Sequence, residues 1–206
     1  MSAAEVEPPD GFDAPAPADA VLRMLDGVMA GLGGLVGDCS PVTDATRIDR
    51  IAVLERLRAV VAAALAAETV RFAKSQTAAQ LAAGVHPRRI GKGIADQIGL
   101  ACHLSASQGG RRLACARAWW FDLPETYAAL TAGLLSERVA EAVVEQTRHL
   151  DHHLRREVDA EVIAAGIAGM GFREAGALRR DARLRGGAAG RLGPAGIGAE
   201  AATSRP

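Results

Sequence analysis

The segment from Thr43 to Ala83 constrains the fold of this chain more than any other feature. Large apolar residues recur in it every three or four positions, which is the period of an amphipathic helix. These residues are Ile51, Leu54, Leu57, Val61, Leu65 and Phe72. Thr43 or Asp44 can cap the first turn. The pattern therefore predicts one long helix that begins there and ends near Ala83.

Glu68 falls on the same face of this predicted helix. One interpretation is a carboxylate at the edge of the core, paired with an arginine of a neighbouring helix. The other is an active-site acid. No second carboxylate or histidine stands at a spacing that would form an acid–base pair with it. We therefore favour the ion pair.

Composition extends the helical prediction to the whole chain. Of the 206 residues 49% are hydrophobic but only 3% are aromatic, so the core must be built mostly from Ala, Val, Leu and Ile. Alanine has the highest helix propensity, and small side chains let helices approach closely. We expect an all-α fold, an irregular multi-helix domain over 44–184. A mostly disordered leader with a marginal helix over 20–37 precedes it (1–43), and a disordered Gly/Ala-rich tail follows (185–206).

Capping residues divide the rest of the predicted domain. Ser105 with Gln108 three residues later has the spacing of a capping box. Pro124 suits the first turn of a helix, and Ser136 can cap another. The stretch 84–93 is a predicted loop, because the residue before a proline disfavours helix. Further helices are predicted over 94–103, 105–121, 125–132, 136–150, 151–165 and 172–184.

Charge is distributed very unevenly along the chain. Between Arg71 and Arg117 there are eight basic residues and one acid, Asp96, which gives a local charge of about +7 (eight minus one) in a chain with 24 residues of each sign. A polyanion responds to this local field and not to the neutral total. Nucleic acid is therefore the first partner to consider. The predicted phosphate contacts are Arg88, Arg89, Lys92, Arg111, Arg112 and Arg117.

The segment LACHLSASQGGRRL, residues 100–113, has the pattern of a helix-turn-helix. Such a motif presents its second helix to the major groove of DNA. Two positions depart from the usual pattern: His103 stands where glycine usually makes the turn, and Gly109 stands where a β-branched residue usually packs. Three interpretations stay open. They are a groove-reading motif, a tight helical corner with a solvated arginine face, and non-specific phosphate binding by the same arginines.

Two further clusters of side chains are candidate sites. Trp119, Trp120 and Phe121 cannot all point one way on a helix, so we expect one indole to pack in the core and the other to be part-exposed, as an anchor or as a surface for bases or a partner. The second cluster is His149, His152 and His153, of which His149 and His153 are four residues apart and could share a helix face, as zinc ligands do. Asp151 between them has the position of a helix cap, so a polar helix junction is predicted there.

The cysteines and the apolar segments indicate where the protein is located. Cys39, Cys102 and Cys115 fit no disulfide framework, which favours a reducing compartment. The apolar run from Val60 to Ala67 is too short to span a bilayer, and the N-terminus lacks the pattern of a signal peptide. We expect a soluble cytoplasmic protein without a catalytic set, a metal or a cofactor.

Four segments carry a resemblance to a known family. They are LERLRAVVAAALAAETVRFA, IADQIGLACHLSASQGGRRLACARAW, DLPETYAALTAGLLSERVAEAVVEQTRHLD and RREVDAEVIAAGIAGMGFREA. From about Ile51 to Glu174 the chain resembles an actinobacterial family, the domain of unknown function 222, which includes the mycobacterial thirteen-E-twelve repeat proteins. In that family the helical domain usually precedes a C-terminal HNH endonuclease module.

The resemblance implies an association with metal-dependent DNA cleavage, which the HNH module performs with histidines, asparagines and zinc-type cysteines. No histidine follows His153 and no cysteine follows Cys115, so those roles have no positions here. We expect a non-catalytic helical domain, truncated or frameshifted relative to the family, that binds DNA through its basic segment. The alternatives are a protein-interaction or homo-oligomerisation module, and a remnant without activity.

Overall fold

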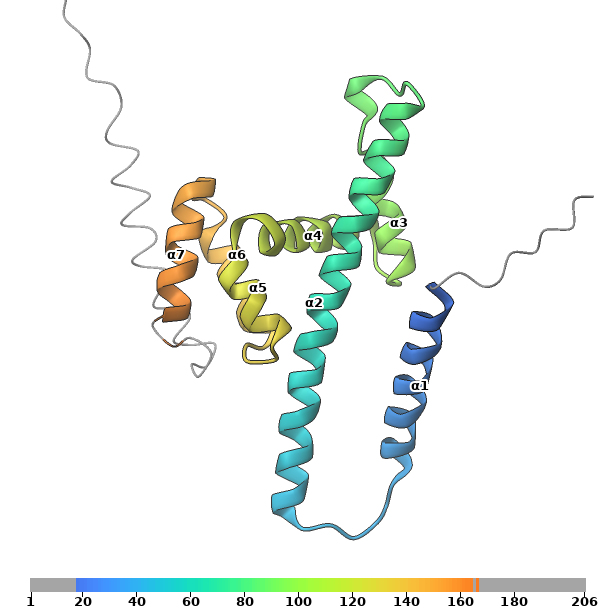
Figure 1. The fold of residues 1–206 in the computed structure, drawn as a ribbon, viewed down its shortest axis with the longest axis vertical. Helices are drawn as coiled ribbons and strands as arrows, with labels where there is room; N and C mark the ends of the chain where they lie inside the picture. Colours follow the sequence, from blue (N-terminus) through green and yellow to red (C-terminus); the bar gives the residue numbers. More distant parts are fainter. Residues whose placement is uncertain (1–17, 165, 167–206) are drawn as a thin grey trace, which may run out of the picture. The chain divides into compact units, whose positions relative to one another are not determined.

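A computed structural model describes residues 18–164 and Gly166 (Figure 1). All regular structure in this part of the chain is helical, which confirms the predicted all-α class. The chain divides into two compact units, residues 1–47 and 48–206, and each is described by itself. The predicted helix over 172–184 and the tail over 185–206 lie outside the described residues.

The first unit contains helix α1 (Ala18–Gly37), which the sequence predicted as a marginal helix. At about 100° per residue, its nine large apolar side chains fall within about 160° of the helix circumference, and its glycines lie on the other side. These apolar residues are Val21, Leu22, Met24, Leu25, Val28, Met29, Leu32, Leu35 and Val36. Among the described helices, α1 is the one whose length and composition would also allow it to cross a membrane.

The long helix is α2 (Asp44–Ala82), and its bounds agree with the prediction. Thr43 caps it, because its Oγ1 accepts a hydrogen bond from the backbone N–H of Thr46 at 3.2 Å. Glu68 does not pair with a neighbouring helix as predicted. It is exposed and pairs with Arg71, three residues on in α2 itself.

The face of α2 that packs against the other helices consists mostly of alanine. The buried residues are Ala59, Ala62, Ala63, Ala66, Ala67, Thr69, Val70 and Ala73. The large residues of the predicted stripe are instead mostly on the surface, since Ile51, Leu54, Val61 and Leu65 are between 36% and 61% exposed. The large apolar residues and the alanines both recur at helical spacing, and the alanines are the ones that belong to the buried core.

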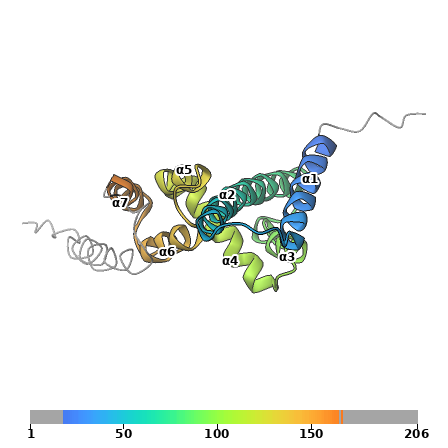
Figure 2. The ribbon, with the colours of Figure 1, turned by 90° about the horizontal axis from the view of Figure 1, so that it is seen from below.

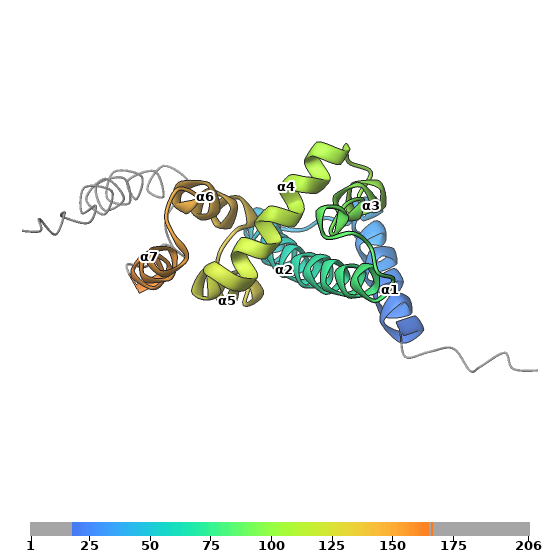
Figure 3. The same ribbon diagram turned by 90° about the horizontal axis from the view of Figure 1, so that it is seen from above.

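After α2 and the short 3-10 turn η1 (Pro87–Arg89), six further elements follow in the described part of the second unit. They are α3 (Ile94–Ala101), α4 (Ala106–Arg117), a π-helical turn η2 (Ala118–Asp122), α5 (Pro124–Thr131), α6 (Glu137–Thr147) and α7 (His152–Ala164). Helix α4 crosses α2 and links α3 at its beginning with α5 at its end (Figures 1 and 3). Helices α5, α6 and α7 gather on one side of α2 (Figure 2).

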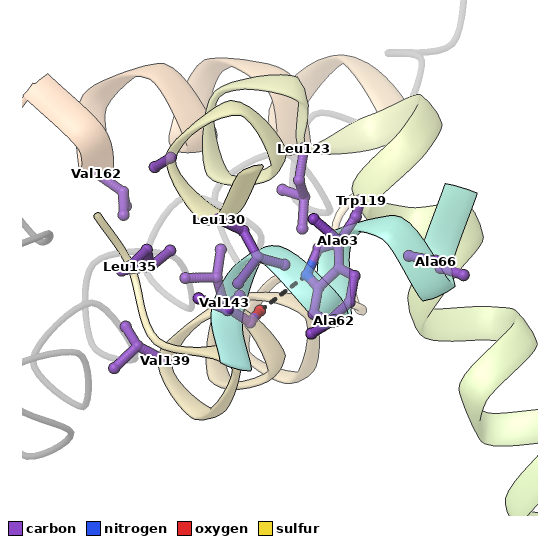
Figure 4. Packing of buried hydrophobic residues seen from close by; sticks show 14 of the residues in the cluster. Ala62, Ala63, Ala66, Trp119, Leu123, Leu130, Leu135, Val139, Val143 and Val162 are labelled. Atoms are coloured by element: carbon purple, nitrogen blue, oxygen red, sulfur yellow. Dashed lines mark hydrogen bonds between the residues drawn. The ribbon is translucent and has the colours of Figure 1, made fainter. Parts of the chain in front are cut away.

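Trp119 anchors the main hydrophobic core. Its side chain is 4% exposed, and its Nε1 donates a hydrogen bond to the carbonyl oxygen of Ala140 at 3.1 Å. Leu123, Leu130 and Val143 surround the indole together with the alanines of α2 (Figure 4). The prediction that one indole packs is confirmed.

Most predicted caps are present, and the helices end where local geometry stops them. Ser136 Oγ accepts from the N–H of Val139, and Asp151 Oδ1 accepts from the N–H of Leu154 at 3.0 Å. Helix α6 ends at Thr147, three residues earlier than predicted, and α3 ends at Ala101, two residues earlier. The predicted loop over 84–93 contains one short 3-10 turn, Pro87–Arg89.

Helix α5 receives its N-terminal cap from α7. Leu123 at its N-cap position supplies no side-chain acceptor. Asp159, which is fully buried, accepts instead from the N–H of Glu125 at 2.7 Å and from the N–H of Thr126 at 3.1 Å. The hydroxyl of Thr126 donates to the same carboxylate. Burial raises the pKa of Asp159, and these hydrogen bonds oppose the shift.

Candidate nucleic-acid interface

Helices α3 and α4, over which the helix-turn-helix pattern was predicted, are joined by a tight turn. Four residues, 102–105, join the two helices. His103 adopts a φ of 54°, the left-handed conformation that glycine usually supplies. The N–H of Leu104 bonds to the carbonyl of Gly99 at 2.7 Å and that of His103 to Leu100 at 3.1 Å, which is a Schellman motif.

Helix α4 starts at the predicted capping box. The Oγ of Ser105 accepts from the N–H of Gln108 at 3.3 Å, and the Gln108 Oε1 accepts from the N–H of Ser105 at 2.9 Å. The two exchanged bonds satisfy backbone donors that a helix start leaves without partners. Local sequence therefore determines both the turn and the start of the second helix.

Gly109 explains how closely the two helices cross. A Cβ at this position would lie 2.3 Å from the carbonyl oxygen of Ala95 and 2.7 Å from the backbone nitrogen of Gly99. No side chain fits there. Gly109 stands where a β-branched residue is usual, and its missing side chain is what allows the backbones of α3 and α4 to touch.

The outward face of α4 is polar. Ser107, Gln108, Arg111 and Ala114 are exposed, and their spacing places them within about 120° of the helix circumference. All but Ser107 also line a cleft that α4 forms with α6. In a helix-turn-helix this part of the second helix faces the nucleic acid. The arrangement brings Arg111 onto that face.

Three more of the predicted phosphate contacts lie on the loop that follows α2. Arg88, Arg89 and Lys92 are all exposed, and none forms an ion pair with another described residue. The side chain of Gln80 in α2 ties the loop down: its Oε1 accepts from the N–H of Gly91 at 2.6 Å, and its Nε2 donates to the carbonyl of Lys92 at 3.1 Å. Figure 1 shows this loop at the far end of α2.

Arg111 and Arg112 also line a cleft between α4 and α6 with a volume of about 640 Å³. The α6 wall carries Glu137, Glu141 and Glu145, so the cleft has mixed charge. Arg112 is half-buried and faces these carboxylates, whereas Arg111 is exposed. Of the two, Arg111 is therefore the better placed for a polyanion.

Burial and like charge perturb two groups in this cleft. Burial raises the pKa of Glu141, the nearby Glu137 raises it further, and Arg112 opposes the shift. Burial, followed by Glu141 and Glu137, raises the pKa of Cys115 to about 12. A thiol with so high a pKa holds almost no thiolate near neutral pH and is a poor nucleophile. Cys115 thus behaves as a structural side chain.

Arg117 stands apart from the cleft. It is exposed at the end of α4, six residues after Arg111, which places it about 120° around the helix. The π-helical turn follows Arg117 directly. In it Trp119 is buried, Trp120 is partly exposed and Phe121 is 42% exposed. The six predicted contacts therefore lie in three places, the loop, the α4 face by the cleft, and the end of α4.

At the predicted histidine junction, the contacts to another element come from His152 and Arg155. His152 Nδ1 lies 2.7 Å from Asp122 Oδ1, and Arg155 donates to the other oxygen of the same carboxylate. These contacts connect α7 to the end of η2. No group of three or more His, Cys, Asp or Glu residues suited to a metal occurs among the described residues.

Sequence reasoning missed several residues that shape this region. Gln80 and Asp159 act on partners 11 to 34 residues away, and Glu137 of α6 pairs with Arg58 of α2 at 3.9 Å. The α6 glutamates alone had a readable signal, a repeat of every four residues on a helix that faces α4. Gln80 and Asp159 carry no local pattern that distinguishes them from ordinary polar residues.

No protein-family model, no curated protein and no solved structure matches the chain. The resemblance to the domain of unknown function 222 family stays a prediction.

Proposed function

We propose that this chain is a non-catalytic, DNA-binding helical domain of the HNH-endonuclease-associated type that its sequence resembles. The observation that carries the proposal is the α3–α4 corner, whose second helix presents Arg111 outward. The loop cations Arg88, Arg89 and Lys92 supply phosphate contacts. Arg117 adds a contact at the end of α4, and Arg112 contributes less because it faces Glu141.

The electrostatics of the cations support this assignment. The three loop cations are exposed and have no ion-pair partner among the described residues, so a phosphate would not have to displace a carboxylate. Charge-assisted contacts of this kind provide most of the affinity in non-specific DNA binding. Base edges would be read by the outward residues of α4, Ser107, Gln108 and Arg111.

The test is a titration of a labelled DNA duplex followed by fluorescence anisotropy. With about six phosphate contacts, affinity should fall roughly 10³-fold when salt rises from 50 to 200 mM. Binding that does not change with salt, or no binding at 50 mM, would contradict the proposal.

A second candidate function, self-association or binding of a protein partner, is favoured by one observation. Leu54, Val61 and Leu65 lie within about 40° of each other on α2 and are 36–51% exposed. Large exposed apolar patches mark interaction sites on soluble proteins. The stripe lies on the flank of α2 away from its buried alanine face.

Sedimentation of the full chain tests this second candidate. If the stripe associates, Val61→Glu should convert an oligomer to a monomer and leave the helical circular dichroism unchanged. Ala64→Glu, also exposed on α2 but off the line of Leu54, Val61 and Leu65, is the matched control. A wild-type chain that is monomeric at tens of micromolar would exclude self-association.

A further inference from the structure

We infer that the end of α4 holds a second nucleic-acid subsite, which stacks unpaired bases on Phe121 while Lys74, Arg71 and Arg117 bind the adjoining phosphates. The inference rests on the proposed function for the class of its partner. It goes further by specifying single-stranded or locally melted nucleic acid, whereas the α3–α4 corner is suited to a duplex groove.

The π-helical turn creates the subsite. Turns of this kind add a residue to a helix and are frequent at functional sites. Here the turn buries Trp119, whereas Phe121 remains 42% exposed. Trp120 is partly buried and packs against Tyr127, with the ring centroids 5.7 Å apart. Tyr127 is in turn fixed by a hydrogen bond from its hydroxyl to the carbonyl of Ala63.

Cations from α2 sit over these rings. The Nζ of Lys74 lies 5.2 Å from the Phe121 centroid and 5.7 Å from the Trp120 centroid. The guanidinium of Arg71 lies 5.9 Å from the Trp120 centroid. Arg117 precedes the two rings by three and four residues, which places it on the same side of the helix.

Local charge favours a polyanion at this subsite. Neither Lys74 nor Arg117 has a carboxylate within 4.0 Å among the described residues, and Arg71 pairs only with the exposed Glu68. Lys74 thus lies over the exposed Phe121 ring, Arg71 lies over the neighbouring Trp120, and Arg117 stands one helical turn before them. A basic surface with an exposed aromatic side chain is how proteins bind single strands without reading their sequence.

The surroundings of the two rings predict which of them stacks on a base. Trp120 packs against Tyr127 and has two cations within 6 Å of its ring, so less of it is open to a stacking base. Phe121 is 42% exposed and has Lys74 alone near its ring. A strand laid across the subsite would place a base on Phe121 and a phosphate within reach of Lys74, and would change the environment of Trp120 beside it.

The experiment uses the full chain with two labelled probes, a 15-nucleotide oligo(dT) and a 15-base-pair duplex. Oligo(dT) should quench tryptophan emission in the wild type. It should not do so in Trp120→Phe, because the remaining Trp119 is buried. Phe121→Leu should weaken oligo(dT) binding about 5- to 100-fold, the usual effect of losing one stacked base. Phe121→Tyr keeps the ring and should bind within about twofold of the wild type.

The outcomes separate this inference from the proposed function. If the duplex binds and Phe121→Leu binds oligo(dT) as the wild type does, the stacking subsite is wrong and the proposed function stands. If polyglutamate quenches Trp120 as strongly as oligo(dT), the surface is a site for acidic peptides and the inference is overturned. If neither nucleic acid binds at low salt, both fail together.

Discussion

Asp159 is the residue on which the packing of the C-terminal helices most depends. It is fully buried, and it accepts hydrogen bonds from two backbone amides and one hydroxyl at the start of α5. Removing the acceptor would leave Thr126, which is also buried, with two donors that water cannot reach. Buried polar groups without a partner are among the costliest single defects in a fold.

Substitution of Asp159 should therefore destabilise the protein far more than substitution of an exposed cap. We expect Asp159→Ala to lower the free energy of unfolding by about 2–4 kcal/mol. Asp151→Ala, which removes the single exposed cap bond at the start of α7, should cost about 1 kcal/mol. Urea denaturation followed by circular dichroism measures both. Equal losses would show that the buried cap has no special role.

The pH dependence of the same site has a definite sign. Burial raises the pKa of Asp159 above its ordinary value of 3.8, so the folded state binds the proton more tightly than the unfolded state does. The stability due to this carboxyl is therefore complete below that value and is lost as the pH rises through the folded pKa. Relative to Asp159→Asn, which does not titrate, the wild type should lose stability from acid towards neutral pH. A constant difference would contradict the raised pKa.

At the scale of an element, the α3–α4 corner depends on two kinds of residue. The turn and the start of α4 are set by Ser105, Gln108 and the left-handed His103, and these act on their immediate neighbours. The crossing itself depends on Gly109, whose absent side chain lets α4 touch the backbone of α3. The candidate reading face of α4 is thus held in place by a contact that any side chain would disrupt.

Gly109→Ala should open this corner. Its Cβ would meet backbone atoms at 2.3 and 2.7 Å, so the helices must separate, and we expect a loss of about 1–3 kcal/mol. Gly110→Ala is the matched control, because its Cβ would only touch the Cβ of Ala95 at 4.0 Å. There the higher helix propensity of alanine should leave stability unchanged or raised by up to about 1 kcal/mol. Thermal unfolding of the two variants measures the contrast, and similar melting temperatures would refute it.

An element could be predicted from the sequence where the residues that fix it contact near neighbours in the chain, and not where they contact distant segments. Ser105, Pro124 and Ser136 cap or open their own helices, so sequence reasoning placed those helix starts closely. It did not identify the packed face of α2, because large apolar residues and alanines both recur with helical period there. It also missed the π-helical turn and the cap from Asp159, which depend on contacts between distant segments.

At the scale of the whole molecule, the six predicted phosphate contacts are spread over the loop after α2, the α4 face by the cleft and the end of α4, and Arg71 and Lys74 lie on α2 itself. The count of charges along the sequence predicted one basic region, but it could not show that the cations lie in separate places on the surface. The structure also places Glu137, Glu141 and Glu145 opposite Arg112. The loop cations, which have no such opposition, should therefore contribute most to the salt dependence of DNA binding.

The most direct test of the account is the salt slope of duplex binding for two matched triple variants. Wild type should show a slope of log affinity against log salt of roughly −5, since each phosphate contact contributes roughly −0.9. Arg88→Gln/Arg89→Gln/Lys92→Gln should reduce its magnitude by roughly 2.7. Arg47→Gln/Arg56→Gln/Arg156→Gln removes the same charge from exposed positions outside the interface and should leave the slope nearly unchanged. Equal slopes for the two variants would contradict binding through this loop.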